Sequence, residues 1–205
     1  MQWRLACGGV FSYFGFFLLT PVMFHYHGAE TAGQMGLTWA LIAAMQAAAL
    51  AWVQTRVPRF GILIAKQDYV ELDRIFRRLT VVSLVAIAAG GAAIVAIVYV
   101  LPRLPFELTE RMAQGLLSPL PTLLLVLTVV IDQVLNCQVF YVRAHKREPF
   151  LALNVTSNLL IGLAVWLLGS RCGPTGAAWG YLGVTAFYLL PYTAYIWSRS
   201  RREWH

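Results

Sequence analysis

One acidic residue lies deep inside a long apolar stretch, and polar residues recur around it at helical spacing. Asp132 stands between Leu116 and Arg143, with Thr128 four residues before it and Asn136 four residues after it. In a helix this spacing places all three polar side chains on one stripe. A carboxyl group in an apolar medium must be neutral or paired, which makes Asp132 a candidate functional residue. Two interpretations stay open: the wall of an aqueous cavity that binds a cation, a proton or a sugar hydroxyl, or a hydrogen bond between helices.

Two amides repeat this pattern further along the chain. Asn154 and Asn158 are four residues apart, so they share one face of a helix. An amide both donates and accepts hydrogen bonds, as the recognition of sugar hydroxyls requires. The same groups also suit helix–helix hydrogen bonds, which contribute about 0.6 kcal/mol on average in a bilayer. Both interpretations stay open here as well.

A dense group of cations separates two apolar runs. Arg143, Lys146 and Arg147 fall within the stretch YVRAHKREPF. Cations near a membrane surface attract anionic lipid headgroups, with about 1 kcal/mol contributed by each. Cations that flank apolar runs also set the topology of a membrane protein, and this simpler role accounts for much of the pattern.

Catalytic and metal-binding motifs are missing from the sequence. It contains no G-x-S-x-G, no HExxH, no P-loop and no pair of carboxylates within one apolar run. His25, His27 and Glu30 have the spacing H-x-H-x-x-E but lack a firm further ligand. We therefore expect neither an enzyme, nor a metal site, nor a cofactor, apart from coupling to a proton or sodium gradient through Asp132.

Apolar runs dominate the chain and determine its expected fold. The sequence is 59% hydrophobic and 12% charged, whereas a soluble domain carries about 25% charged residues. Runs of about 18 or more apolar residues can cross a membrane as helices, and these runs lack the period-2 alternation of barrel strands. The predicted fold is an all-α integral membrane protein, a six-transmembrane-helix bundle with spans at about 5–24, 37–55, 79–101, 116–142, 150–168 and 177–197.

The distribution of charge predicts the orientation. Thirteen of the 16 Lys and Arg residues fall on one side of the predicted spans, and only Arg103, Arg111 and Arg171 fall on the other. The positive-inside rule then places both termini in the cytoplasm. The basic residues flank apolar runs instead of forming one polar face, so we expect membrane lipids and no nucleic acid as partners. Residues 58–78 are predicted to form a cytoplasmic amphipathic connector lying at the membrane surface.

Four stretches of the sequence occur in an order that carries a resemblance. GAETAGQMGLTWAL, TRVPRFGILIAKQDYVELDRIFRR, YVRAHKREPF and CGPTGAAWGYLG follow one another within the predicted six-span topology. Together they resemble the second half of the bacterial polysaccharide-biosynthesis flippases. These proteins belong to the MOP superfamily, which also contains the MATE drug exporters and the lipid II flippase. The resemblance covers residues 3–205.

The resemblance implies a fold and a function. Such proteins have two six-helix lobes around a central cavity and move an undecaprenyl-pyrophosphate-linked oligosaccharide across the bacterial inner membrane by alternating access. This chain resembles one lobe, so we expect a fragment of a longer transporter, or a half-transporter that pairs with a second six-helix lobe or a second copy of itself. The polyprenyl-linked glycan would meet the residues singled out above: Arg143, Lys146 and Arg147 at the pyrophosphate, and Thr128, Asp132, Asn136, Asn154 and Asn158 along the glycan. A MATE-type antiporter lobe and a non-transporting scaffold subunit are the alternatives.

Overall fold

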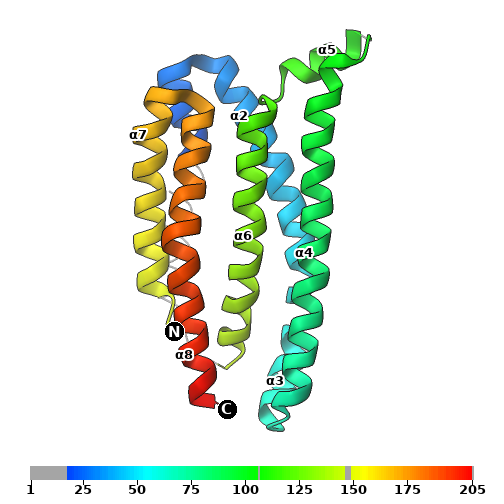
Figure 1. Ribbon diagram of the computed structural model, residues 1–205, viewed down its shortest axis with the longest axis vertical. Helices are drawn as coiled ribbons and strands as arrows, with labels where there is room; N and C mark the ends of the chain where they lie inside the picture. Colours follow the sequence, from blue (N-terminus) through cyan, green and yellow to red (C-terminus); the bar gives the residue numbers. More distant parts are fainter. Residues whose placement is uncertain (1–17, 106, 146–148, 205) are drawn as a thin grey trace.

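The structure, a computed structural model, describes residues 18–105, 107–145 and 149–204, and these residues form helices with no strand (Figure 1). Four helical segments of the described chain are long and apolar enough to cross a membrane: Leu19–Ala65, Tyr69–Arg103, Pro119–Ala144 and Leu151–Arg202. The helices are α2 (Leu19–Gln54), α3 (Val57–Ala65), α4 (Tyr69–Val100), α5 (Glu107–Gln114), α6 (Pro119–Ala144), α7 (Leu151–Val184) and α8 (Leu190–Trp204), with a 3₁₀ turn at Leu101–Arg103 and a π-helical stretch at Thr185–Leu189.

Two of the long helices contain a glycine whose backbone is not helical. Gly28 in α2 has φ 89° and ψ 175°, and Gly173 in α7 has φ 62° and ψ −151°. Glycine adopts a positive φ at little cost because it has no Cβ atom. At Gly173 the chain turns back at the upper end of the bundle, from the yellow part of α7 to its orange part (Figure 1). The predicted spans 150–168 and 177–197 lie on either side of this turn.

The predicted boundaries agree with the structure in some places and differ in others. The run expected at 116–142 is α6, and the run at 37–55 lies almost wholly within α2. Most of the span predicted at 5–24 lies outside the described residues. The predicted six-span count therefore stays a prediction, whereas an all-helical chain with long apolar segments is what the structure has.

The expected connector over residues 58–78 is divided in the structure. Its first part is α3, and its second part is the beginning of α4, which continues without a break to Val100. Asp68 starts this helix, because its side chain accepts a hydrogen bond of 3.1 Å from the backbone N–H of Glu71. Leu72 and Leu79 then pack with Phe60 of α3 in one apolar cluster. The charged beginning of α4 is thus fixed by the helix cap at Asp68 and by the apolar cluster that it shares with α3.

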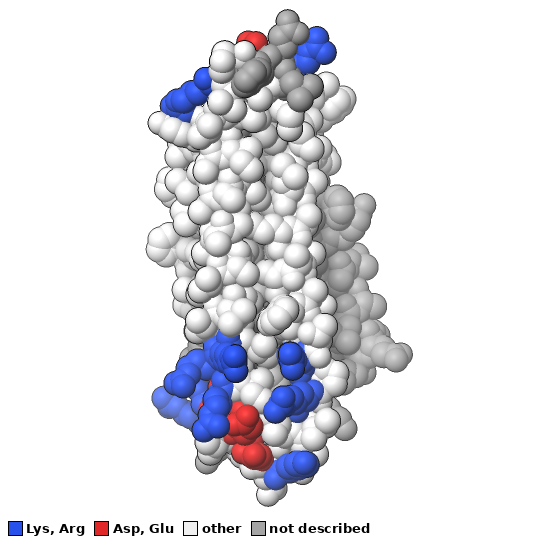
Figure 2. Space-filling model, turned by 90° about the vertical axis from the view of Figure 1, so that its right-hand side faces the viewer, with Lys and Arg blue, Asp and Glu red and all other residues white. Residues whose placement is uncertain are grey.

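Charged side chains gather at the two ends of the molecule. On the face drawn in Figure 2, an uncharged belt separates them. The lower end, called the cationic end from here on, is formed by α3, the first turns of α4, and the last turns of α6 and α8 (Figure 1). This arrangement is that of a helical bundle embedded in a membrane. The described cations of these segments are Arg56, Arg59, Lys66, Arg74, Arg77, Arg78, Arg143, Arg199, Arg201 and Arg202.

Glycines allow α4 to approach its neighbours closely. A Cβ atom added at Gly91 would lie 2.4 Å from Cγ1 of Val126 in α6, and one at Gly90 would lie 2.7 Å from Sδ of Met45 in α2. Such distances leave no room for a methyl group unless a helix or a side chain moves. In a bilayer, where neighbouring lipid is as apolar as the helix surface, close packing at small residues is a main source of helix association.

We expect the substitution Gly91→Ala to destabilise the bundle by about 1–3 kcal/mol, because overpacking a well-filled core has a cost of that size. Thermal unfolding of the detergent-solubilised protein measures this effect. Gly33→Ala is the matched control, since Gly33 is also in a helix and an added Cβ there meets no atom within 4 Å. Equal melting temperatures for the two variants would contradict the close approach of α4 and α6.

Candidate functional site

A polar cavity lies inside the bundle, among α2, α6, α7 and the C-terminal helices. Its volume is about 240 Å³. Apolar side chains form part of its wall, but most of the residues that line it carry an amide, a hydroxyl or a carboxyl group. These polar residues are Gln46, Asp132, Asn136, Asn154, Ser157, Asn158, Tyr181 and Thr193.

The structure brings together four of the five residues that the sequence singled out for a cavity. Asp132 and Asn136 enter the wall from α6, and Asn154 and Asn158 enter it from α7. Helical spacing indicated that Asp132 and Asn136 share one helix face and that Asn154 and Asn158 share another. In the fold, both faces point into the same cavity. The amides and the carboxyl group therefore form one site instead of two separate polar stripes.

Thr128, the fifth residue, does not line the cavity. Its side chain is fully buried, and its hydroxyl donates a hydrogen bond of 2.9 Å to the backbone carbonyl of Leu124. A threonine in an apolar helix commonly satisfies its hydroxyl in this way on the preceding turn. The structure therefore gives Thr128 an internal hydrogen bond and no place in the cavity wall.

Asp132 makes the interhelical contact that the sequence left open as an alternative. Its carboxyl group lies next to the hydroxyl group of Tyr181, which comes from α7 beyond the turn at Gly173. The ring of Tyr181 also packs on Trp39 of α2, with the ring centroids 5.7 Å apart. Asp132 thus has a neighbour on another helix and also lines the cavity.

The amide side chains at the wall are anchored to their own helices. Asn136 Nδ2 donates to the carbonyl of Asp132 at 2.8 Å, and Asn158 Nδ2 donates to the carbonyl of Asn154 at 2.7 Å. These bonds fix how each amide is presented to the cavity. A surface of oriented amides and hydroxyls can exchange hydrogen bonds with a polar uncharged ligand or with water.

Four polar residues of this wall were not among the predicted site residues: Gln46, Ser157, Tyr181 and Thr193. Gln46 had a readable signal, because it is the only polar side chain in the apolar run from Leu41 to Val53. The rule that singled out Asp132, that polar groups within membrane helices are candidates for function, applies to it equally. Thr193 carries no such signal, since isolated threonines are common in apolar helices.

The cationic cluster is described only in part. Arg143 lies in the last turn of α6 at the cationic end and is half-buried. Lys146 and Arg147 lie outside the described residues. The headgroup-attracting role expected for these three residues therefore stays a prediction.

The histidines of the H-x-H-x-x-E stretch lie in α2, and His27 lies beside the turn in α7. His27 Nε2 lies 2.7 Å from the carbonyl oxygen of Gly169, four residues before the turn at Gly173. His25 packs edge-on against Tyr26. Among the described residues, no group of three or more His, Cys, Asp or Glu side chains could hold a metal ion.

No family model, no curated protein and no solved structure matches this chain. The chemistry of the cavity therefore rests on its own residues.

We expect water to reach this cavity, and cysteine labelling can test it. In a background with Cys7, Cys137 and Cys172 replaced by alanine, Asn158→Cys should react with a charged thiosulfonate at least about tenfold faster than Leu159→Cys. The reason is that the reactive thiolate forms only where water or polar groups stabilise it. Leu159 is 57% exposed but lies on the apolar surface of the same helix, so it is the matched control. Faster labelling of Leu159→Cys would contradict a wet cavity.

Proposed function

We propose that this protein is one half of a conduit that moves a lipid-linked oligosaccharide, carried on undecaprenyl pyrophosphate, across the bacterial inner membrane. The observation that carries the proposal is the polar cavity within an otherwise apolar bundle. Amides and hydroxyls with fixed orientations suit the hydroxyl groups of a sugar, because each can donate or accept. A cavity built only for packing would be filled by apolar side chains.

The proposed arrangement in the membrane has six crossings and a cytoplasmic cationic end. The glycines at 28 and 173 would each separate two crossings, of which the first is the predicted span 5–24 and the last continues from α7 into α8, with both termini in the cytoplasm. The concentration of Arg and Lys at the cationic end supports this orientation through the positive-inside rule. Arg143, Lys146 and Arg147 would then attract the pyrophosphate group from the cytoplasmic leaflet.

The size of the cavity supports a partial conduit. At about 240 Å³ it is smaller than the pockets of about 300–1,000 Å³ that enclose a drug-sized ligand. It would therefore hold only a part of an oligosaccharide. The rest of the path would come from a second six-helix lobe or from a second copy of this chain.

A second candidate function is a lobe of a MATE-type cation-coupled antiporter. The observation that favours it is a carboxyl group, Asp132, in the wall of a cavity and next to a tyrosine hydroxyl. The charge at the cationic end favours an anionic lipid-linked substrate over a cationic drug. Coupling through Asp132 to a proton or sodium gradient fits both candidates.

Reconstitution in proteoliposomes tests the proposal. The purified chain would be reconstituted with an undecaprenyl-pyrophosphate-linked oligosaccharide, and a lectin outside the vesicles would report the glycan that becomes exposed. We expect lectin binding to increase with time, faster for the dimeric fraction than for the monomeric one. Absence of vectorial activity from both fractions would favour a scaffold subunit. Gradient-driven efflux of an organic cation would favour the antiporter.

We expect the substitution Asp132→Asn to remove gradient coupling while leaving the fold intact, because the amide keeps the shape of the side chain and loses its charge. A potential of about 100 mV supplies about 2.3 kcal/mol per charge moved, so stimulation of the native protein can reach about fiftyfold. For the variant, the ratio of the transport rate with the gradient to the rate without it should be near one. Glu110→Gln, a neutralised carboxylate on the exposed surface of α5, should keep the native ratio. Unchanged stimulation in Asp132→Asn would contradict the assignment.

A further inference from the structure

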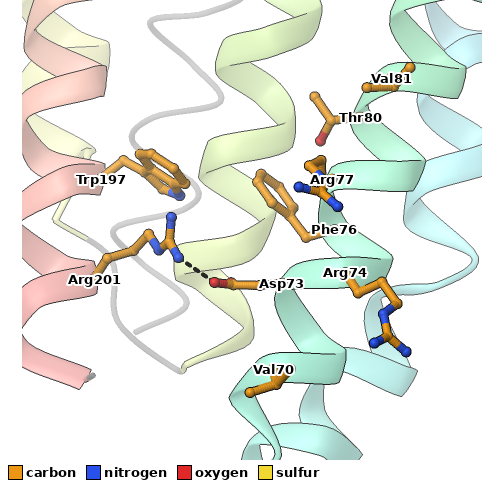
Figure 3. Close-up of a pocket in the computed structure, with 9 residues that line it drawn as sticks. All are labelled: Val70, Asp73, Arg74, Phe76, Arg77, Thr80, Val81, Trp197 and Arg201. Carbon is orange, nitrogen blue, oxygen red and sulfur yellow. Dashed lines mark hydrogen bonds and ion pairs between the residues drawn. The ribbon is translucent and has the colours of Figure 1, made fainter.

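A second cavity lies at the cationic end, between α4 and α8, and it differs in character from the first. Its volume is about 530 Å³. Figure 3 shows Phe76 and Arg77 of α4 across this cavity from Trp197 and Arg201 of α8, with Asp73 below them. Guanidinium groups and aromatic rings meet at the wall, at the level where the charged end passes into the uncharged belt.

The charges around this cavity leave one net positive charge. The carboxylate of Asp73 is ion-paired with Arg201 and also accepts a hydrogen bond of 2.9 Å from the Tyr141 hydroxyl. Arg77 makes no ion pair with any residue that the structure describes. Arg74 also lines the cavity, but it pairs with Glu71 at 3.0 Å, and in Figure 3 it points away from Arg201. One guanidinium, that of Arg77, therefore faces the cavity without a counter-charge from the part of the chain that the structure describes.

Two enclosed nitrogen donors of α8 also lack an acceptor. Trp197 Nε1 and Arg201 Nε are shielded from solvent, and neither has a hydrogen-bond partner among the described residues. Buried hydrogen-bond donors nearly always have an acceptor. Two neighbouring donors without one, beside a cavity, indicate a place for a ligand that carries acceptors. The oxygen atoms of a bound anion would supply acceptors, with a small rotation of the two side chains.

The outer surface of α4 continues from this cavity into the apolar belt. Val81 lines the cavity and is 54% exposed, and Val85, one turn further along the helix, is 62% exposed. Both side chains lie on the outside of the bundle, on the same helical stripe as Arg77. A ligand with its anionic group at Arg77 would therefore have an apolar surface beside it that runs along α4 into the belt. An acyl chain of a lipid can lie on such a surface.

We infer that this cavity binds the phosphodiester group of an anionic bilayer phospholipid of the phosphatidylglycerol type. Arg77 and Arg201 contact the phosphate oxygens, and an acyl chain lies along Val81 and Val85. The single net positive charge matches a phosphodiester, which carries one negative charge, better than a pyrophosphate, which carries more. The lipid is thus a bound component that bridges α4 and α8, distinct from the proposed transported carrier, and its binding does not depend on transport.

Native mass spectrometry of the detergent-purified chain tests this inference. Dioleoyl phosphatidylglycerol should remain bound as a single copy at low concentration, whereas dioleoyl phosphatidylcholine and inorganic phosphate should not. Arg77→Gln should weaken the retention of phosphatidylglycerol about fivefold, which corresponds to about 1 kcal/mol for one cation at an anionic lipid. Arg77 is exposed, so this variant is expected to fold normally.

Arg78→Gln is the matched control. It removes the same charge from the neighbouring position of α4, but Arg78 is exposed and does not line the cavity. Its retention of phosphatidylglycerol should stay within a factor of about two of the native value, since a charge outside the site contributes only weakly through solvent. Equal losses in the two variants would mean non-specific attraction and would overturn the inference.

Two further readouts separate the sources of the phosphate group. Phosphatidylglycerol brominated on its acyl chains should quench a tryptophan signal that Trp197→Phe removes, since a lipid in this cavity touches that ring. Displacement of the lipid by inorganic phosphate would assign the cavity to a free anion. Tighter, Arg77-dependent binding of undecaprenyl pyrophosphate would assign it to the carrier. Either result would overturn the inference, and neither would decide whether the chain transports a glycan.

Discussion

The absence of water around most of the chain is the constraint on which the structure depends. In an apolar medium a polar group must find its partner within the protein, because no solvent replaces a missing hydrogen bond. Thr128 bonds to the carbonyl one turn earlier, His27 meets the carbonyl of Gly169 beside a turn, and Asp132 meets Tyr181. The bond of Thr128 stays within its own helix, whereas the contacts of His27 and Asp132 also connect helices.

The same constraint makes glycine important for the packing. Burial of apolar surface gives helices little reason to associate in lipid, so close contact must supply the stabilisation. Gly90 and Gly91 let α4 approach Met45 and Val126, and beyond the turn in α7 a Cβ atom at Gly180 would lie 3.0 Å from the backbone of Ala164. These approaches set how the helices lie against one another, and so determine which side chains face the inner cavity.

The two cavities differ in a way that follows from their depth. Most polar residues of the inner cavity carry amides and hydroxyls, with one carboxyl group at Asp132, and amides and hydroxyls interact with neutral polar groups without a large cost of burying charge. The cavity at the cationic end lies where charged side chains still reach water, so guanidinium groups can line it. A lipid-linked glycan has both kinds of chemistry, sugar hydroxyls and phosphate, and a bilayer phospholipid has only the second. This difference supports separate occupants for the two sites.

By itself, the sequence determined the helical class of the fold, the long apolar segments and the pairing of polar residues on single helix faces, because these depend only on composition and on the 3.6-residue period. It predicted four residues that meet at the inner cavity, Asp132, Asn136, Asn154 and Asn158. Only the tertiary structure decided that their two faces meet, that Gln46 and Tyr181 join them, that Thr128 does not, and that α4 begins at Tyr69. Periodicity states which residues share a face, but the rotation of a helix against its neighbours depends on the shapes of both surfaces in contact, and no single segment of sequence contains both.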